Sequence, residues 1–312
     1  MTTRVLVTGA AGYIGSVLCG RLLAAGYAVT GLDNLMYGEQ GLLPLCADER
    51  FDFVFGDARD ERTVKPLLGN VDVIVPLAAV VGAPACDRDP WLATSTNLDA
   101  VRMLNRLRSP GQLVVYPTTN SGYGTRSGEV RCTEDTPLEP ISLYGRTKVE
   151  AERELLGSPN AVSFRLATVF GVSPRMRIDL LVNHFTYAAV TDGYLVVFEK
   201  HFRRNFVHIR DVADGFVHGI ERASQMTGRA YNMGLDSANL SKEELALLVQ
   251  KHVPRFFVHF AEVGSDPDKR DYIVSNQRLR EAGFEARRSL DDGIRELLKA
   301  YRLMGRGRFR NV

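Results

Sequence analysis

Six short apolar runs, separated by stretches in which apolar residues recur at helical spacing, fill the first 170 residues of the chain. The runs are residues 4–8, 28–32, 51–55, 71–79, 112–116 and 161–167. Runs of this length between turn residues indicate buried strands. Strands that alternate with helices predict a parallel sheet covered on both faces, with ligands at the carboxyl ends of the strands.

Beyond residue 170 the alternation breaks down, and the pattern predicts a second domain assembled from separate pieces. The segment around Phe206–Ile209 is expected to return to the main sheet. The expected fold class is therefore α/β, a Rossmann-type doubly wound parallel sheet with a smaller, discontinuous C-terminal substrate domain. Residues 1–170, with a returning segment at about 203–225, would form the first domain. Residues 171–202 and 226–312 would form the second.

Three helix signals occur in the second half of the chain. Asp211 is a candidate N-cap for a helix over residues 212–223. The sequence Ser241-Lys242-Glu243-Glu244 is a capping box that predicts a helix to about His252. The apolar spacing from Leu290 to Leu303 predicts a closing amphipathic helix.

The first apolar run leads into the sequence Gly9-Ala10-Ala11-Gly12-Tyr13-Ile14-Gly15, and a helical pattern follows it. Glycines let a backbone approach a pyrophosphate, and the amino end of a helix supplies free N–H groups and a positive dipole. This order of strand, glycine turn and helix predicts a dinucleotide phosphate site. Tight packing of strand against helix is the alternative explanation.

Acidic and small residues follow the next three runs. Asp33 ends the second run, where an acid accepts hydrogen bonds from the adenosine ribose and repels a 2′-phosphate, which favours NAD over NADP. Asp57 ends the third run, where it could meet the adenine amino group. A solvated turn is the alternative for both aspartates. The fourth run ends in Leu77-Ala78-Ala79, whose small side chains would let a cofactor lie across the strand end.

The chemistry is expected at Tyr144 and Lys148, which lie four residues apart and so share one face of a helix. A phenol has a pKa of about 10 and is a poor base at neutral pH. An ammonium within about 4–6 Å favours the phenolate and lowers that pKa. The pair can therefore move a proton on or off a sugar or alcohol oxygen. Thr119 follows the fifth run in a segment rich in hydroxyl groups and would face this helix.

Composition excludes several other classes of protein. The 312 residues carry a formal net charge of +2, which gives no general attraction to nucleic acid. The four cysteines are scattered without a Cys-x-x-Cys pair, so neither a disulfide framework nor a metal site is expected. No apolar run approaches the ~20 residues of a membrane span. A soluble protein of the reducing cytoplasm is expected, with no membrane or nucleic-acid partner, and the basic tail after Gly305 is interpreted as a solvated end.

Taken together, the motifs resemble those of the extended short-chain dehydrogenases/reductases, and specifically the nucleotide-sugar epimerase/dehydratase family. The resemblance runs through the whole chain in order. It rests on Thr8–Gly15, Leu32-Asp33-Asn34-Leu35, Gly56-Asp57, Leu77-Ala78-Ala79, Tyr123-Gly124, Ser142-x-Tyr144-Gly145-x-Thr147-Lys148 and Arg204-Asn205-Phe206-Val207-His208-Ile209-x-Asp211.

The resemblance implies a catalytic triad in which Tyr144 is the acid/base, Lys148 lowers its pKa and holds the nicotinamide ribose, and Thr119 binds the substrate oxygen. It also implies NAD as the cofactor. The residues expected to bind NAD, besides Tyr144 and Lys148, are Gly9, Gly12, Tyr13, Ile14, Gly15, Asp33, Asn34, Asp57, Ala58, Leu77, Ala78, Ala79 and Asn97.

A nucleotide-diphosphate sugar is the substrate that the resemblance implies. Arginine suits its phosphate oxygens because the guanidinium forms two parallel hydrogen bonds. Surface ion pairs are the alternative for such arginines. The residues expected to contact the substrate, besides Thr119, are Asn120, Arg175, Arg177, Asn183, Arg204 and Arg270, with Arg270 the less securely aligned of the two diphosphate arginines.

Departures from the family pattern narrow the expected reaction. Relatives that remove water across the sugar 4,6-positions typically carry Asp-Glu where this chain has Asn120-Ser121, and those that epimerise at carbons 3 and 5 carry Cys at the Ser121 position. Pro76 replaces a His of many relatives and should affect packing more than chemistry. The leading hypothesis is thus an NAD-dependent epimerase at carbon 4. The alternatives are an NAD(P)H-dependent 4-keto nucleotide-sugar reductase and a non-catalytic NAD-binding protein.

Relatives commonly pair through two long helices into a four-helix bundle. The segments 90–108 and 143–157 could form such a bundle here. A homodimer is therefore expected.

Overall fold

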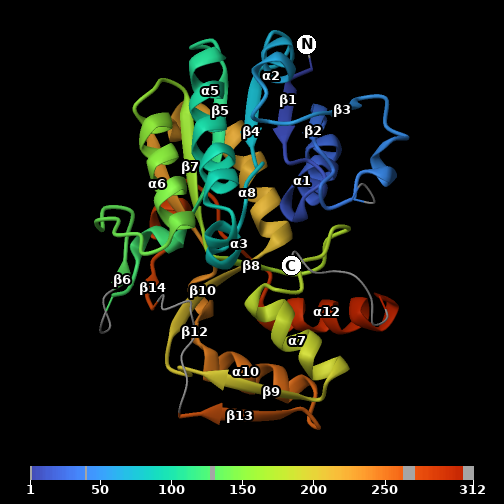
Figure 1. Cartoon of the computed structure of the whole chain (residues 1–312), viewed down its shortest axis with the longest axis vertical. Coiled ribbons are helices and arrows are strands. Elements are labelled where there is room, and N and C mark those ends of the chain that lie inside the picture. Colours follow the sequence, from blue (N-terminus) through green and yellow to red (C-terminus); the bar gives the residue numbers. More distant parts are fainter. Residues whose placement is uncertain (1, 39–40, 127–130, 263–270, 305–312) are drawn as a thin grey trace.

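The computed structural model describes residues 2–38, 41–126, 131–262 and 271–304 of the chain. Its centre is a seven-stranded sheet in the order β11-β7-β5-β4-β1-β2-β3, in which every neighbouring pair is parallel (Figure 1). The strands are β1 (Arg4–Thr8), β2 (Ala28–Asp33), β3 (Phe51–Phe55), β4 (Val73–Pro76), β5 (Leu113–Thr119), β7 (Ala161–Leu166) and β11 (Arg229–Met233). The predicted α/β class and parallel sheet are confirmed.

Helices cover both faces of this sheet. Side chains alternate between the faces along each strand, so Val5 and Val7 pack into one hydrophobic cluster and Leu6 into another. On the first face lie α1 (Tyr13–Ala24) and α8 (Ile209–Glu221), which contact each other. On the second lie α2 (Glu61–Leu68), α5 (Ala100–Leu107) and α6 (Leu143–Leu156). Burial on both faces explains the nearly continuous apolar runs of the central strands.

The strand that returns to the sheet is not the one expected. The segment around Phe206–Ile209 contributes β10 (Arg203–His208), which pairs with β8 (Thr168–Phe170) and β12 (Asn239–Ser241) in a separate three-stranded sheet. The seventh strand of the main sheet is instead β11, parallel to β7. The chain does come back at α8, whose packing on α1 covers the sheet. The two domain boundaries stay a prediction.

The remaining elements form a lower lobe (Figure 1). It contains α7 (Leu181–Thr191), α10 (Lys242–His252), α12 (Leu290–Met304) and a parallel pair of strands, β9 (Tyr194–Phe198) and β13 (Phe257–Ala261). The strand β6 (Arg131–Cys132) pairs in parallel with β14 (Ile273–Val274) at the edge of the molecule. Short helical turns are η1 (Leu43–Leu45), α3 (Ala83–Arg88), η3 (Asn120–Tyr123), α9 (Ala223–Met226), η4 (Asp236–Ala238) and α11 (Gln277–Glu281).

Helix ends follow the sequence signals with one exception. Ser241 and Glu244 form the predicted capping box at the start of α10, and the closing helix is present as α12. Asp211 is not an N-cap, because α8 already begins at Ile209 and His208 accepts the hydrogen bond from Arg210 N–H. The Asp211 carboxylate instead accepts from the backbone N–H and guanidinium of Arg288.

The helical segment after Pro90 is interrupted by a wider turn. Pro90 occupies the first position of α4 (Pro90–Thr94), and Asp89 caps it by accepting a hydrogen bond from Leu92 N–H at 2.9 Å. A π-helical turn, η2 (Ser95–Asp99), then leads into α5. Such turns are rare and often occur at functional sites. This one contains Asn97.

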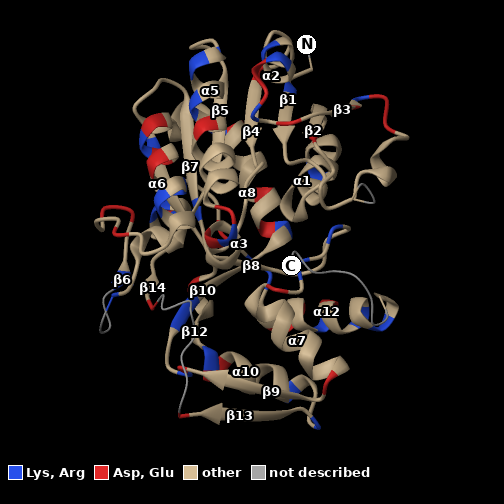
Figure 2. Ribbon diagram, viewed as in Figure 1, with Lys and Arg blue, Asp and Glu red and all other residues tan. Residues whose placement is uncertain are grey.

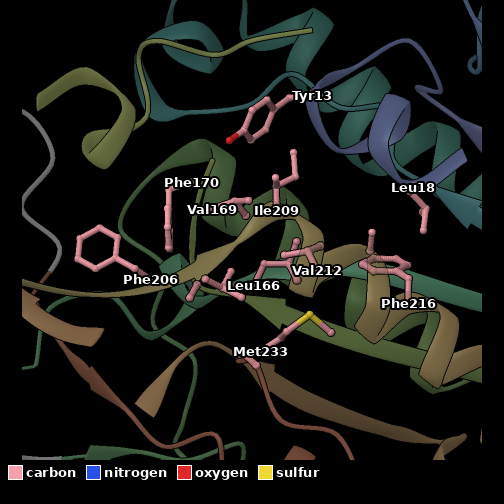
Figure 3. Packing of buried hydrophobic residues seen from close by; sticks show 14 of the residues in the cluster. Tyr13, Leu18, Leu166, Val169, Phe170, Phe206, Ile209, Val212, Phe216 and Met233 are labelled. Carbon is pink, nitrogen blue, oxygen red and sulfur yellow. The ribbon is translucent and has the colours of Figure 1, made fainter. Parts of the chain in front are cut away.

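One hydrophobic cluster joins the sheet to the segments below it. Figure 3 shows side chains from α1, β7, β8, β10, α8 and β11 in one hydrophobic cluster, with Phe206 and Phe170 at one end and Phe216 at the other. The same cluster continues through Val182 of α7 and Leu297 of α12. The lower lobe is therefore packed onto the sheet by a continuous core. Within the described residues, no helix is both long and apolar enough to cross a bilayer.

Candidate active site

The glycines of the loop between β1 and α1 are packed closely against neighbouring backbone, so a side chain at Gly9 or Gly15 would not fit. Gly9 adopts a φ of +71°, and a Cβ there would lie 2.7 Å from the Ala78 nitrogen. A Cβ on Gly15 would collide with the carbonyl oxygen of Gly9. Gly12, the N-cap of α1, supplies no side-chain cap, and the first turn of α1 contains no acidic residue. No acidic side chain of α1 itself therefore neutralises the positive end of its dipole.

Asp33 lies beside this loop at the end of β2. Its two carboxylate oxygens accept from the backbone N–H groups of Ala11 and Leu35, at 2.9 and 2.8 Å. Burial raises the pKa of Asp33, and these N–H groups oppose that shift. The adjacent Asn34 side chain accepts from Met36 N–H at 3.2 Å. Asp33 thus fixes both the glycine loop and the turn that follows β2.

Lys148 is buried on α6, and its Nζ lies 4.0 Å from the ring centroid of Tyr116 on β5. Burial lowers the pKa of Lys148 to about 7, while Glu152 one turn further along opposes the fall. Burial raises the pKa of Tyr116 well above its usual value, and nearby Tyr144 adds to that shift. The structure therefore places Lys148 over the Tyr116 ring and puts Tyr144 on the same helix, α6; their joint catalytic role stays a prediction.

The carboxyl end of β5 presents polar groups toward this helix. Thr119 Oγ1 donates to Ser121 Oγ at 2.9 Å and accepts from Ser121 N–H. Among the residues that the structure describes, the Tyr116 hydroxyl, the Thr118 hydroxyl and both polar atoms of Asn120 are buried without a hydrogen-bond partner. Buried polar groups rarely stay unpaired. The polar groups along β5 and at its end can therefore form hydrogen bonds with a polar ligand or ordered water.

A buried ion pair between Glu152 and Arg165 lies one helical turn beyond Lys148. Glu152 accepts two hydrogen bonds from the Arg165 guanidinium, at 3.0 and 2.7 Å, and one from Ser163 Oγ at 2.7 Å. Arg165 also donates to the Tyr123 hydroxyl at 3.1 Å. The sequence analysis missed Glu152 and Arg165. The signal for Glu152 was its position four residues beyond Lys148 on the same helix.

Asn97 and Asn183 are both fully buried, and protein groups engage their amides. Asn97 accepts from Val80 N–H at 2.8 Å and donates to Val80 O at 2.9 Å, which fixes the segment after β4. Asn183 accepts from Gly171 N–H and donates to Arg177 O and to the Tyr13 hydroxyl. These side chains hold loops in place in this structure. Their predicted contacts with cofactor and substrate stay predictions.

Tyr13 is also mostly buried, and its hydroxyl donates to Gly171 O at 2.7 Å. Its side chain therefore ties α1 to the segment after β8, while Tyr13 and Ile14 begin the helix at the glycine loop. Leu77, Ala78 and Ala79 follow β4 and are partly buried, with Ala78 N–H donating to the Thr8 hydroxyl at 3.3 Å.

The predicted substrate arginines lie in different surroundings. Arg175 stacks over Tyr37, with 4.5 Å from its guanidinium carbon to the ring centroid, and Arg177 forms an ion pair with Asp179. Arg204 is buried on β10 and lies 5.9 Å from the Tyr272 ring centroid. Arg270 lies outside the described residues.

Asp57, expected near adenine, forms an ion pair with Arg59 at 2.6 Å, and this guanidinium lowers the pKa of Asp57. Arg59 in turn lies 5.5 Å from the centroid of the exposed Trp91 ring. The neighbouring Ala58 packs at the edge of the cluster under α2. In the described part of the chain, no three His, Cys, Asp or Glu side chains gather as metal ligands would.

These features define a Rossmann-type nucleotide-binding fold that carries a glycine loop after β1 and a tyrosine–lysine pair on α6. The sequence matches the NAD dependent epimerase/dehydratase family over residues 5–234. The chain belongs to this family, so it is an enzyme that uses NAD. The glycine loop, the uncapped start of α1 and the Asp33 carboxylate fit that cofactor.

Individual relatives span nearly the whole chain. It is 31% identical to the UDP-glucose 4-epimerase of Mycolicibacterium smegmatis, covering 96% of this chain and 98% of that protein. It is also 31% identical to the dTDP-glucose 4,6-dehydratase of Streptomyces griseus, covering 94% and 92%. A solved dTDP-glucose 4,6-dehydratase from Streptomyces venezuelae, with NAD bound, superposes with a TM-score of 0.85 at 26% identity, covering 97% and 98%.

Proposed function

We propose that this protein is an NAD-dependent nucleotide-sugar epimerase that acts at carbon 4 of the sugar. The observation that carries the proposal is the position of Lys148: it is buried over the Tyr116 ring and lies on α6 one helical turn after Tyr144. The unpartnered amide of Asn120 lies at the end of the same strand. The relatives named UDP-glucose 4-epimerase and UDP-arabinose 4-epimerase support the substrate class.

In this proposal Tyr144 removes the proton of the 4-hydroxyl group and returns it after the sugar has turned over. Lys148, as an ammonium, stabilises the Tyr144 phenolate across one helical turn. Thr119 donates a hydrogen bond to the oxygen as negative charge develops on it. The glycine loop and Asp33 would hold NAD, which would supply the hydride acceptor and donor for carbon 4. The cofactor is regenerated in each cycle, so no outside reductant is consumed.

The residues after Thr119 argue against the dehydratase reaction. Elimination of water across carbons 5 and 6 requires one group to remove the carbon 5 proton and another to protonate the leaving hydroxyl. Asn120 and Ser121 stand next to Thr119, and neither an amide nor an aliphatic hydroxyl can supply this acid and base chemistry at neutral pH. We therefore favour epimerisation, although relatives of both kinds match the chain.

The remaining roles follow from position. The glycine loop, the start of α1 and the segment after β4 would contact the pyrophosphate, and Asp33 the adenosine ribose. Arg204, with Arg270 beyond the described residues, would bind the substrate diphosphate. Asn97 and Asn183 would act by holding the loops that line these sites.

The test is to incubate purified protein with UDP-glucose, UDP-arabinose or dTDP-glucose and no added NAD(P)H, and to separate the products by ion-exchange chromatography. Conversion of one of them to its 4-epimer, with the carbon 4 hydrogen retained, supports the proposal. If none of these sugars is converted, but a 4-keto nucleotide sugar is reduced with one equivalent of added NAD(P)H, the proposal is contradicted and the 4-keto reductase is favoured. Release of water from the sugar identifies a dehydratase.

We also propose a homodimer, formed through α5 and α6, in the cytoplasm. Basic and acidic residues alternate along α6 (Figure 2), and Arg102 of α5 already forms ion pairs with Glu150 and Glu154 within the chain, at 2.5 and 2.6 Å. A dimer formed on this face would be polar, so its dissociation constant should rise with salt concentration. Sedimentation at 0.05 and 0.5 M NaCl tests this expectation.

A further inference from the structure

The segment between β8 and α7 is fastened across the start of α1. Ser173 Oγ donates to Tyr13 O at 2.8 Å and lies 3.0 Å from Ser16 Oγ, while the Tyr13 hydroxyl donates to Gly171 O at 2.7 Å. All four residues are at least nine-tenths buried. The segment therefore has a fixed course over the turn of α1 that faces the dinucleotide site.

From this course Arg175 reaches the turn that follows β2 and Asp33. Its guanidinium carbon lies 4.5 Å from the centroid of the Tyr37 ring, in the turn after β2. Burial raises the pKa of Asp33, and the backbone N–H groups and the Arg175 charge oppose that rise. Arg175 Nη1 also donates to Met176 O at 2.7 Å, which orients the side chain.

The turn that carries Tyr37 is held in a conformation that costs energy. Leu35 has a φ of +56°, which is unfavourable for a residue with a bulky side chain. The turn is fixed by the Asp33 carboxylate on Leu35 N–H and by Gly38 N–H on Leu35 O at 2.9 Å. Strain of this kind persists only where surrounding contacts impose it. The hydrogen bonds of this turn therefore fix the backbone that carries the Tyr37 ring toward Arg175.

We propose that Arg175 and Tyr37 form a latch over the adenosine half of the NAD site, and that this latch must open before the cofactor can leave. The latch joins two segments distant in sequence, each tied separately to the glycine loop: Asp33 holds Ala11 N–H, and Ser173 holds Tyr13 O. Its role is to retain NAD between turnovers. It does not depend on which sugar is bound or which reaction follows.

Opening the latch breaks a partly exposed cation–π contact, and such contacts are typically worth about 3- to 10-fold in an equilibrium constant. Arg175→Gln and Tyr37→Ala should therefore each release NAD about 3- to 10-fold faster. The double variant should be no faster than the faster single variant, because both changes remove the same contact. Tyr37→Phe should release NAD at the wild-type rate, since it keeps the ring face.

The experiment loads each purified variant with NAD, removes free cofactor, and follows release into an excess of a second NAD-binding enzyme. Met36→Ala is the matched control, because Met36 is exposed in the same turn and carries neither the positive charge nor the aromatic ring of the latch. Thermal unfolding checks that each variant is folded. Wild-type release from both Arg175→Gln and Tyr37→Ala would overturn the proposal.

A second readout separates retention from recognition of a 2′-phosphate. If Arg175 served to bind that phosphate, Arg175→Gln would weaken NADP binding and leave NAD release unchanged, which would also overturn the latch. Because release is measured without any sugar, failure of the proposed epimerase reaction leaves this measurement interpretable.

Discussion

Because Lys148 is buried, we expect it to affect the free energy of unfolding and its pH dependence as well as catalysis. The fall of its pKa from 10.5 to about 7 corresponds to about 5 kcal/mol, at 1.36 kcal/mol per pH unit. Below about pH 7 the lysine is charged in both the folded and the unfolded protein, and the full cost of burying the ammonium is present. Above pH 10.5 it is neutral in both and the cost vanishes. Between these values the unfolded chain binds more protons, so stability rises with pH.

The perturbation is Lys148→Met in the NAD-free protein, which replaces the ammonium by an unbranched apolar side chain of similar length. Glu152 keeps its partner Arg165, so the change leaves no buried charge unpaired. We expect the variant to be more stable than the wild type by about 4 kcal/mol at pH 7 and by about 2 kcal/mol at pH 9. Its catalytic activity should be lost, because Tyr144 no longer has a cation beside it.

The measurement is urea unfolding followed by circular dichroism at pH 7, 8 and 9. Lys65→Met is the control, because Lys65 is exposed on α2 and its replacement should give the same small difference at every pH. A stability difference between Lys148→Met and wild type that does not change from pH 7 to pH 9 would refute the reasoning about burial.

Three further predictions concern the site and its support. Tyr144→Phe should lower turnover by about 100- to 10,000-fold while NAD still binds, as measured by initial rates and cofactor titration; turnover near the wild-type rate would exclude Tyr144 as the acid/base. Glu152→Gln leaves the buried Arg165 without its counter-charge and should cost about 3–5 kcal/mol in urea unfolding, whereas a loss below 1 kcal/mol would show that the pair is not needed. Gly15→Ala should prevent NAD binding, because its Cβ collides with backbone, and Gly20→Ala, whose Cβ makes only an ordinary contact at 3.5 Å, should bind NAD normally in calorimetry.

Much of the fold could be predicted because local signals and burial agree. The apolar runs became strands, and the capping box at Ser241 opens its helix as expected. The place of β10 could not be predicted, because β10 and β11 are both short and partly apolar. Which of them pairs with β7 depends on contacts between residues far apart in the chain.

For the candidate site, too, features set by local spacing could be predicted, and contacts between distant segments could not. The spacing of Tyr144 and Lys148 predicts their common face, since helix geometry is local. Val80, Tyr13 and Arg288, the partners of Asn97, Asn183 and Asp211, lie 17 or more residues away in the chain. Each amide or carboxylate has the same local pattern whether it binds a ligand or braces a loop. The stacking of Arg175 on Tyr37 likewise joins two loops whose meeting no sequence spacing shows.

The continuous core that runs from α1 and β7 through α8 to α7 and α12 also constrains how ligands enter. The sheet and the lower lobe share this hydrophobic core, so they cannot separate by a hinge motion without exposing Phe170, Phe206 and Leu297 to water. Exposure would cost roughly 1.5–3 kcal/mol for each side chain. Binding and release of cofactor and sugar must therefore depend on local rearrangement of surface loops. Heating should melt both parts in a single transition.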